Sequence, residues 1–400
     1  MPARLDELEQ YAIDVILERR HGLRPSLLRW GLGLLARVYS VMVQFRLYLY
    51  RTRLLRDHQL GCLVISIGNL TVGGTGKTPV VEKFARALQM NGRRVAILSR
   101  GYKSIDLRRK PTWYERLLRK GPMHPPRIVS DGRRVLLDSA TSGDEPYMLA
   151  SNLRGVAVVV DKDRVKAGRH AIKYLHADTL LLDDGLQYLH LRHRLDVVLV
   201  DRQAPFGNEH LLPRGTLREP PRNLRRANYI MITKCNGESN EDLIREIRLY
   251  NRTAEIIECA HKPLYLRHLY HDERLPLDYL KGLYIACLCG IAAPESFQTG
   301  LRRLGANIEI SRSFADHHRY TKAELESFLQ RCIRRDVSAI ITTEKDAVRF
   351  PVIDPLPIPI YYLRLEIEIL KGQEIWDRCI ERICRPAMPR RLQPDLVFGL

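Results

Sequence analysis

The sequence predicts an α/β protein with parallel β-sheet and two sets of alternating strands and helices. The 400-residue chain is long enough for two or three domains. Short apolar runs alternate with amphipathic segments between residues 62 and 200, and again from residue 229 onward. This alternation is typical of βαβ units, whose helices cover both faces of a parallel sheet. A hydrophobic content of 45% is enough to form the buried cores of such lobes.

The first element is an apolar segment, residues 27–50, which we expect to lie on a membrane surface. A spanning helix needs about 20 mostly apolar residues, but Arg29, Arg37 and Arg46 interrupt this one. Each arginine at a bilayer centre costs about 2.5–3.5 kcal/mol, whereas an interfacial helix keeps its arginines among phosphates. A helix packed on the protein's own core is the alternative. We assign residues 1–58 to this membrane-associated segment.

The first alternating set follows directly. The predicted strands are residues 62–67, 95–98, 156–160, 179–182 and 195–200, and the predicted helices are 79–90, 145–153 and 165–175. A proline- and arginine-rich segment, residues 205–226, then predicts a junction between domains.

The second set begins at residue 229. The predicted strands are residues 229–233, 284–288, 308–310 and 339–342, and the predicted helices are 241–250, 295–304 and 322–334. Residues 351–359 form a proline-rich connector, and a closing helix is expected over 376–384.

The charge of the chain indicates an anionic partner. Lys and Arg number 65 and Asp and Glu 46, which gives a formal net charge of +19. A phosphorylated ligand, an anionic membrane or nucleic acid would each match this excess. Nucleic acid is not expected, because no RRM, zinc-finger or helix-turn-helix signature is recognisable. The basic stretch 100–134 is either a solvated loop or a second contact for membrane or substrate. The eight cysteines have no CxxC spacing, so reduced thiols are expected.

A glycine-rich loop after the first strand predicts phosphate binding. Residues 68–79 read GNLTVGGTGKTP and lie between a strand and a helix, as a P-loop requires. Its backbone amides and the helix N-terminus would hold phosphate oxygens, Lys77 would reach the β- and γ-phosphates, and Thr78 would hold Mg²⁺. Thr71 stands where the strict pattern has glycine.

Three further groups of acidic residues and histidine carry candidate chemistry. Asp183 or Asp184 ends an apolar strand and would sit beside the metal, as in a Walker B motif. Asp144 opens a predicted helix and is either an N-cap or a catalytic carboxylate. Asp316 and His317 lie in a loop of the second set, where an Asp-His pair can act as an oriented base.

Together these motifs resemble the tetraacyldisaccharide 4′-kinase family from about residue 27 to residue 350. The matching motifs are SIGNLTVGGTGKTP (66–79), LSRGY (98–102), SGDEP (142–146), LLDDGLQ (181–187), LLPRGTLRE (211–219), FADHH (314–318) and TTEKDAVRF (342–350). The resemblance implies two Rossmann-like α/β/α lobes with the active site between them. It divides the chain into a P-loop kinase lobe (59–215), a second lobe (216–350) and a C-terminal connector and tail (351–400).

The resemblance also implies roles for individual residues. Asp144 would be the catalytic carboxylate, with His317 raising its basicity or relaying the proton, Asp316 steadying that histidine, and Lys77 assisting transfer. The remaining positions are implied to bind ATP (Thr71, Gly73, Gly74, Thr75, Gly76, Lys77, Thr78 and Gln187) and Mg²⁺ (Thr78, Asp183, Asp184 and Glu219).

The implied reaction transfers the γ-phosphoryl group of ATP to the 4′-hydroxyl of an acylated glucosamine disaccharide 1-phosphate, in lipid A biosynthesis. The implied location is the cytoplasmic face of the bacterial inner membrane, held peripherally. The alternative is a P-loop GTPase or regulatory nucleotide-binding protein. Its guanine-reading motif would be [NT]KxD, and the nearest match, Thr233 to Asn236 (TKCN), lacks the final aspartate.

Overall fold

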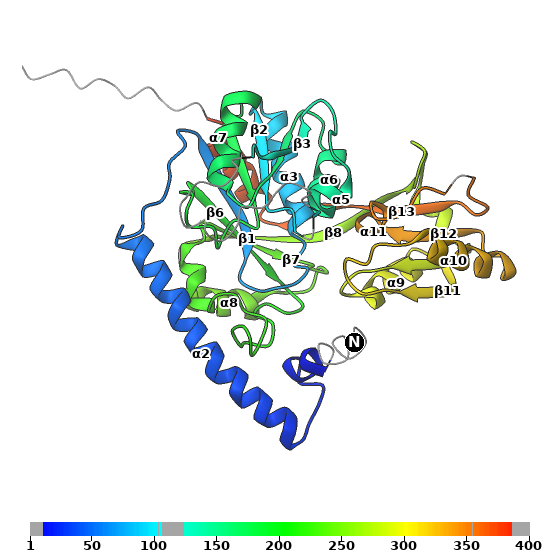
Figure 1. Cartoon of the computed structure of the whole chain (residues 1–400), viewed down its shortest axis with the longest axis horizontal. Coiled ribbons are helices and arrows are strands. Elements are labelled where there is room, and N and C mark those ends of the chain that lie inside the picture. The colour runs from blue at the N-terminus through cyan, green and yellow to red at the C-terminus, as the bar shows by residue number, and fades with distance from the viewer. Residues whose placement is uncertain (1–10, 103, 106–123, 354, 386–400) are drawn as a thin grey trace, which may run out of the picture.

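The computed structural model of the protein describes residues 11–102, 104–105, 124–353 and 355–385. Residues 106–123 of the basic stretch predicted as a loop or second contact lie outside the described residues. Within the described ranges the strands form one mixed 13-stranded sheet, in the order β11-β10-β12-β13-β8-β7-β6-β1-β5-β2-β4-β3, with β9 beside β8. One sheet therefore runs through both halves of the molecule (Figure 1).

The first lobe contains the predicted alternation. Its elements are β1 (Leu63–Asn69), α3 (Lys77–Met90), β2 (Val95–Ser99), β3 (Arg127–Asp131), α5 (Ser139–Ser142), α6 (Asp144–Asn152), β4 (Ala157–Val160), α7 (Arg164–Leu175), β5 (Thr179–Asp183) and β6 (Leu195–Asp201). Strands β2, β4, β5, β1 and β6 are parallel, and β3 is an antiparallel edge strand. The parallel order brings the carboxyl ends of β1 and β5 together, which is where the candidate phosphate and metal residues lie.

The junction between the lobes differs from the predicted one. The 3₁₀ helix η1 (Pro221–Arg226) leads into β7 (Tyr229–Thr233), which pairs in parallel with β6 of the first lobe. Helix α8 (Glu241–Tyr250) and the start of β8 (Glu255–His268) continue the same lobe. The strand 229–233 was predicted to open the second set, but it extends the sheet of the first lobe. The edge of β6 is open there, and pairing with it satisfies the backbone hydrogen bonds of this apolar strand.

The second lobe is formed by the part of the chain that connects two long strands, which pair with each other. Its elements are β9 (Arg274–Leu275), η2 (Leu277–Leu280), β10 (Tyr284–Cys289), α9 (Pro294–Arg303), β11 (Asn307–Ser313), α10 (Lys322–Arg334), β12 (Ala339–Thr343) and α11 (Glu344–Ala347). Strand β13 (Ile360–Lys371) then runs back antiparallel to β8, and α12 (Gln373–Cys384) packs on the first lobe. The predicted tail therefore belongs to the fold, and its expected closing helix is present.

Helices cover both faces of the sheet in each lobe. In the first lobe, α3, α6 and α12 bury Phe84, Leu149 and Trp376 on one face, while α7 and α8 bury Val165 and Ile247 on the other. Alternate residues of the strands supply the two cores, as expected for strands buried on both sides. In the second lobe, α10 and α9 occupy opposite faces in the same way. Both lobes are therefore three-layered around the shared sheet.

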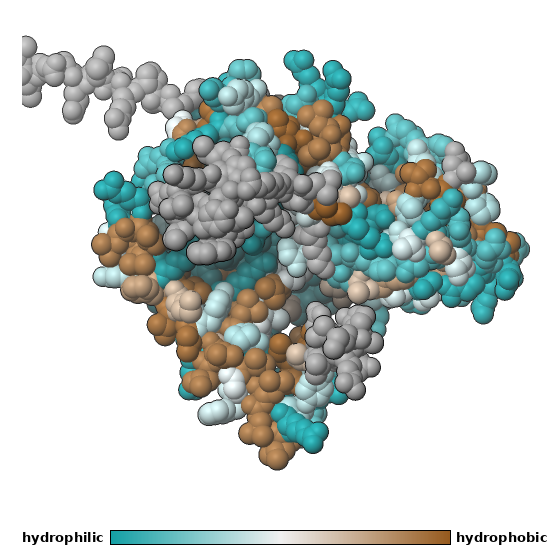
Figure 2. Space-filling view, viewed as in Figure 1, coloured by the Kyte–Doolittle hydropathy of each residue, from teal (hydrophilic) through white to brown (hydrophobic). Residues whose placement is uncertain are grey.

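Helix α2 (Leu23–Arg51) lies outside these layers, along the first lobe (Figure 1). By length and composition alone it could cross a membrane, and only 6% of its most apolar window is buried. It is nevertheless attached to the lobe: the Tyr39 hydroxyl donates to the Arg218 carbonyl at 3.0 Å, and the Gln44 amide donates to Asn223 at 3.3 Å. Figure 2 shows a band of hydrophobic side chains along this helix.

Candidate active site

The glycine-rich loop connects β1 to α3 as predicted. Gly73 (φ 112°) and Gly76 (φ 78°) have left-handed backbone conformations, and Gly76 is the N-cap of α3. No side chain caps α3, so its first amides have no side-chain partner at the N-terminus. Free amides at the positive end of a helix favour an anion. A Cβ on Gly76 would lie 2.7 Å from Nε2 of His261 on β8, so this turn also requires glycine for space.

Thr71 has a structural reason to differ from glycine. Its carbonyl and its hydroxyl both accept hydrogen bonds from the Asn69 amide, at 2.8 and 3.1 Å. Around it, Val72 N–H donates to Thr216 O and Arg218 N–H donates to Leu70 O, both at 2.7 Å. The segment 216–218 therefore fixes the start of the loop as a short antiparallel pair.

Lys77 lies at the meeting point of the loop and the β5 carboxylates. Its ammonium donates to Asn69 Oδ1 at 3.1 Å and pairs with Asp184 Oδ1 at 3.6 Å. Arg218 donates to Asp184 Oδ2 at 2.7 Å. Burial alone would raise the pKa of Asp184, but the charges of Lys77 and Arg218 outweigh it and hold the pKa below its ordinary value. Gln187 donates to the Asn69 carbonyl at 3.1 Å, so it too borders this cluster.

Asp183 is in the opposite electrostatic state. Burial, together with the negative charges of Glu145 and Asp184, raises the pKa of Asp183 to about 7. The Ser99 hydroxyl donates to its Oδ2 at 3.0 Å, while its Oδ1 is buried with no hydrogen-bond partner. A buried carboxylate with an unsatisfied oxygen is the arrangement that a cation would stabilise.

Glu219 is engaged elsewhere. Its Oε2 accepts from Arg226 at 2.6 Å and from Asn223 at 2.7 Å, and the residue is buried. In the ranges described above, no three His, Cys, Asp or Glu side chains gather in a way that could hold a metal ion. The structure therefore brings Asp183 and Asp184 together with Lys77, but ties Glu219 to Arg226 instead.

Asp144 and His317 meet across the two lobes. Asp144 begins α6, and His317 lies in the loop after β11 with a left-handed backbone (φ 66°). His317 Nδ1 lies 3.2 Å from Asp144 Oδ2. On its other side, Lys345 Nζ lies 3.5 Å from His317 Nε2. Arg349 Nη2 also lies 3.3 Å from His317 Nδ1, so each ring nitrogen of His317 lies between a cation and a carboxylate.

Two arginines also hold Asp144. Arg349 donates from Nε to Oδ2 at 2.8 Å, and Arg319 donates from Nη2 to Oδ1 at 3.3 Å. Burial alone would raise the pKa of Asp144, but the hydrogen bond from His317 and the charges of Arg349 and Arg319 keep it below its ordinary value. The expectation that His317 raises the basicity of Asp144 is therefore wrong for this arrangement, because a hydrogen bond to the charged form favours that form.

Glu145 links the two clusters. Its Oε1 lies 3.4 Å from Lys345 Nζ, and its charge raises the pKa of Asp183. Asp316 also pairs with Lys345, at 3.7 Å, and lies 3.9 Å from His317 Nε2. The charge of Glu145 thus couples the residues around Asp144 to Asp183 at the carboxyl end of β5, the edge of an open α/β sheet at which ligands bind.

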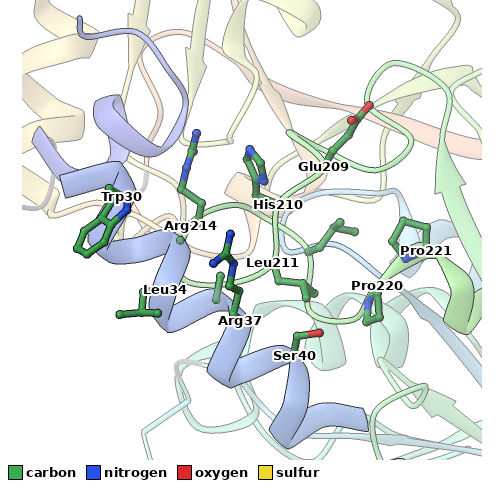
Figure 3. A pocket seen from close by; sticks show the side chains of 13 residues that line it. Trp30, Leu34, Arg37, Ser40, Glu209, His210, Leu211, Arg214, Pro220 and Pro221 are labelled. Atoms are coloured by element: carbon green, nitrogen blue, oxygen red, sulfur yellow. The ribbon is translucent and has the colours of Figure 1, made fainter. Parts of the chain in front are cut away.

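A groove lies between α2 and the segment 209–221 (Figure 3). It has a volume of about 450 Å³. Apolar side chains of Trp30, Leu34 and Leu211 share its lining with the cations Arg37 and Arg214. The carboxylate of Glu209 also lines it, and Arg214 pairs with Glu18 at 2.6 Å, so Arg37 is the lining cation for which no ion pair is seen among the described residues.

Sequence reasoning assigned no role to four charged residues of this site: Glu145, Arg319, Lys345 and Arg349. Three of them belong to the motifs SGDEP and TTEKDAVRF, and Arg319 directly follows FADHH. Each of these four residues could have been singled out as a charged residue that lies inside or next to a family motif and had been given no role.

Both the sequence and the fold are similar to those of known proteins. The family model described as "Tetraacyldisaccharide-1-P 4'-kinase" matches residues 28–384. A tetraacyldisaccharide 4′-kinase of Halothermothrix orenii is 35% identical over 92% of this chain and 95% of its own length. One of Anaeromyxobacter dehalogenans is 39% identical over 83% and 84%. A crystal structure of LpxK from Aquifex aeolicus in complex with ATP has a TM-score of 0.69 at 27% identity, covering 89% of this chain and 99% of that one.

Proposed function

Because the chain belongs to the tetraacyldisaccharide-1-P 4′-kinase family, we propose that the charged site between its lobes transfers the γ-phosphoryl group of ATP to the 4′-hydroxyl of the glycolipid. The activity is that of a tetraacyldisaccharide 4′-kinase in lipid A biosynthesis. The observation that carries the residue assignment is the contact between Asp144 and His317, which lie 3.2 Å apart. Lys345 connects His317 to Glu145, whose charge acts on Asp183 at the end of β5.

ATP would lie over the loop between β1 and α3. The first amides of α3 have no capping side chain, and Lys77 already carries an anionic partner, Asp184, that a triphosphate would replace. Thr71 and Asn69 hold the loop open, and Gln187 borders it. Lys77 would then meet the charge that develops on the β- and γ-phosphates.

Magnesium fits the residues beside that loop. Thr78 and Asp184 would hold it, with Asp183 supplying its unsatisfied Oδ1. Few protein ligands are needed, because Mg²⁺ in phosphoryl-transfer sites keeps several waters and binds substrate phosphates. When bound, the ion would neutralise charge on the transferring group. Glu219 is held by Arg226 and Asn223, so it would contact the ion only after leaving these partners.

Asp144 would accept the proton of the 4′-hydroxyl as that oxygen attacks phosphorus. A sugar hydroxyl is a poor nucleophile, so a positioned base accelerates its attack. His317 orients the carboxylate, and Asp316 and Lys345 fix the imidazole from the opposite side. Asp144 and the loop belong to the first lobe, while His317 comes from the second, so the relative position of the lobes sets this geometry.

The groove and α2 would receive the lipid part of the substrate. An acyl chain matches Trp30, Leu34 and Leu211, and the 1-phosphate matches Arg37. The outer side of α2 exposes Val41 and Phe45, so it would lie in the headgroup region of the cytoplasmic face of the inner membrane. Its hydrogen bonds to the first lobe favour a peripheral helix over a spanning one.

Transfer of labelled phosphate from ATP to an acylated disaccharide 1-phosphate tests this function. Asp144→Ala should lower turnover about 10²–10⁴-fold, while nucleotide binding persists. Near-normal turnover of that variant would remove Asp144 from the mechanism. Replacing ATP by GTP in the same assay separates the kinase from the alternative GTPase, because a GTPase would consume GTP without phosphorylating the lipid.

A further inference from the structure

The two carboxylate oxygens of Asp144 have different kinds of partners. Oδ2 faces Arg349 Nε at 2.8 Å and His317 Nδ1 at 3.2 Å. The Arg349 side chain is 0% exposed and also donates to the Gly290 carbonyl and to Asp346 Oδ1. An arginine held by three acceptors in the protein interior has no room to leave. Oδ2 is therefore occupied permanently.

The other carboxylate oxygen of Asp144, Oδ1, is hydrogen-bonded to a side chain that is free to move. Within the described ranges the residue seen on this oxygen is Arg319, at 3.3 Å, and the same Nη2 donates to the Ser139 carbonyl at 3.1 Å. The Arg319 side chain is 41% exposed. Ion pairs of exposed arginines contribute little and exchange partners readily. Oδ1 is therefore the oxygen that a substrate hydroxyl can reach, once Arg319 has moved.

Geometry limits where Arg319 can go. A base must lie about 2.6–3.2 Å from the proton-bearing oxygen, and that oxygen lies about 3–3.5 Å from the phosphorus it attacks. The γ-phosphorus is then separated from Oδ1 by roughly the sum of these two distances. An arginine side chain that starts beside Oδ1 is long enough to reach it. We propose that Arg319 caps Asp144 Oδ1 before the substrates bind and moves to an oxygen of the γ-phosphate when they do.

The proposal rests on the function proposed above and completes its chemistry. As the cap leaves, the 4′-hydroxyl takes its place on Oδ1. The sugar oxygen forms a bond to the γ-phosphorus, the bond from that phosphorus to the β–γ bridging oxygen breaks, ADP leaves, and the hydroxyl proton passes to Oδ1. Arg319 meanwhile meets the negative charge of the transferring group, as an arginine supplied within the same chain does in other phosphoryl-transfer enzymes.

Removal of one cation also changes the acidity of the base. Asp144 is faced by His317 and Arg319 from the loop after β11 and by Arg349 after α11, while Asp346 shares Arg349 and Lys345 acts through His317. On its own helix, Glu145 is the neighbouring charge. Of the cations that contact Asp144 directly, Arg319 is the most exposed, so the pKa of Asp144 rises when Arg319 turns to a phosphate.

The experiment compares Arg319→Met and Arg319→Lys with the wild-type full-length protein. Arg335→Met is the matched control, because Arg335 is an exposed arginine of the same lobe that pairs with Glu309. We expect Arg319→Met to lower kcat about 10²–10³-fold, with ATP binding changed less than about threefold. Added guanidinium ion should restore part of kcat, and Arg319→Lys should retain more activity than Arg319→Met. The acid limb of kcat/KM should move to higher pH in Arg319→Met, because the free enzyme has lost a cation beside the base.

The outcomes separate this proposal from the function on which it rests. If Asp144→Ala is inactive and Arg319→Met turns over like the control, the cap is overturned and the base remains. A loss of kcat in Arg319→Met with no guanidinium rescue and no movement of the acid limb would mean a merely structural role, and would also overturn the cap. If Asp144→Ala remains active, the base assignment fails and the cap fails with it.

Discussion

Arg349 Nε lies 2.8 Å from Asp144 Oδ2, although 205 residues separate them in the chain. The guanidinium comes from the turn after α11 in the second lobe and the carboxylate from the first turn of α6 in the first lobe. One buried ion pair thus joins the lobes at the point where the chemistry is expected. It keeps the candidate base ionised and fixes its position.

Substitution of Arg349 should destabilise the whole fold. Arg349→Met leaves the buried carboxylates of Asp144 and Asp346 without their shared cation. Removal of one partner from a buried ion pair costs about 3–5 kcal/mol. Urea unfolding should show a loss of this size, against little change in Arg303→Met on the exposed side of α9. A loss below about 1 kcal/mol would contradict the structural role of Arg349.

Asp183→Asn should stabilise the protein at neutral pH while impairing it as an enzyme. The folded pKa of about 7 lies above the ordinary value, so the carboxylate destabilises the fold once it ionises. This penalty is absent below about pH 4 and complete above about pH 7. The difference in Tm between variant and wild type should therefore grow from pH 5 to pH 8, measured without nucleotide or Mg²⁺. A variant that is less stable than wild type at pH 8 would contradict the buried, unpartnered state of Oδ1.

Two glycines of the phosphate loop should respond differently to alanine. At Gly76 the backbone is left-handed and an added Cβ would lie 2.7 Å from His261 Nε2, whereas at Gly74 nothing lies within 4 Å. A left-handed non-glycine residue costs on the order of 1–3 kcal/mol. Thermal denaturation without ligand should show this loss for Gly76→Ala and almost none for Gly74→Ala. Equal effects of the two substitutions would rule out the described turn.

Membrane contact should depend on the outer side of α2. Val38, Val41 and Phe45 are largely exposed there, and each would contribute about 1.5–3 kcal/mol if buried in lipid. Replacing all three by asparagine should reduce co-sedimentation with anionic vesicles by more than tenfold. Leu249→Asn, an equally exposed apolar site on α8, is the matched control. Full retention of vesicle binding by the triple variant would exclude α2 as the membrane contact.

The first lobe was largely predictable because its signals are local. Apolar strands alternate with amphipathic helices, and predicted bounds such as 95–98 and 165–175 differ from β2 and α7 by one residue at most. The same holds for the phosphate loop and the β5 aspartates, since strand, loop and helix are contiguous in sequence.

The strands that join the lobes were not predicted, for physical reasons. Strand β8 contains Pro263, which lies at a register shift in the β8–β13 ladder, where a missing N–H is tolerated. Strand β13 follows a proline-rich connector and alternates charged with apolar residues. Both signals indicate loop or edge when they are judged locally. Each of these two strands is stabilised by pairing with the other, which lies about 100 residues away in the chain.

The composition of the site was only partly predictable for a similar reason. Asp144 and His317 could be matched to a family, but their contact requires both lobes. The charges that surround them depend on distant neighbours: Arg349 and Arg319 lower the pKa of Asp144, and Glu145 raises that of Asp183. These pKa shifts depend on distances in space and on burial, and neither can be read from the spacing of residues along the chain.

The antiparallel pairing of β8 with β13 makes the second lobe a module inserted into the first. The chain leaves the first lobe along β8 and returns along β13, with His268 directly opposite Tyr361 at the far end. Opposed residues of such a ladder lie only about 5 Å apart, so a short hairpin turn would be enough to close the parent lobe after excision of everything between them. The first lobe would then keep all of its own strands, with β13 still paired to β8.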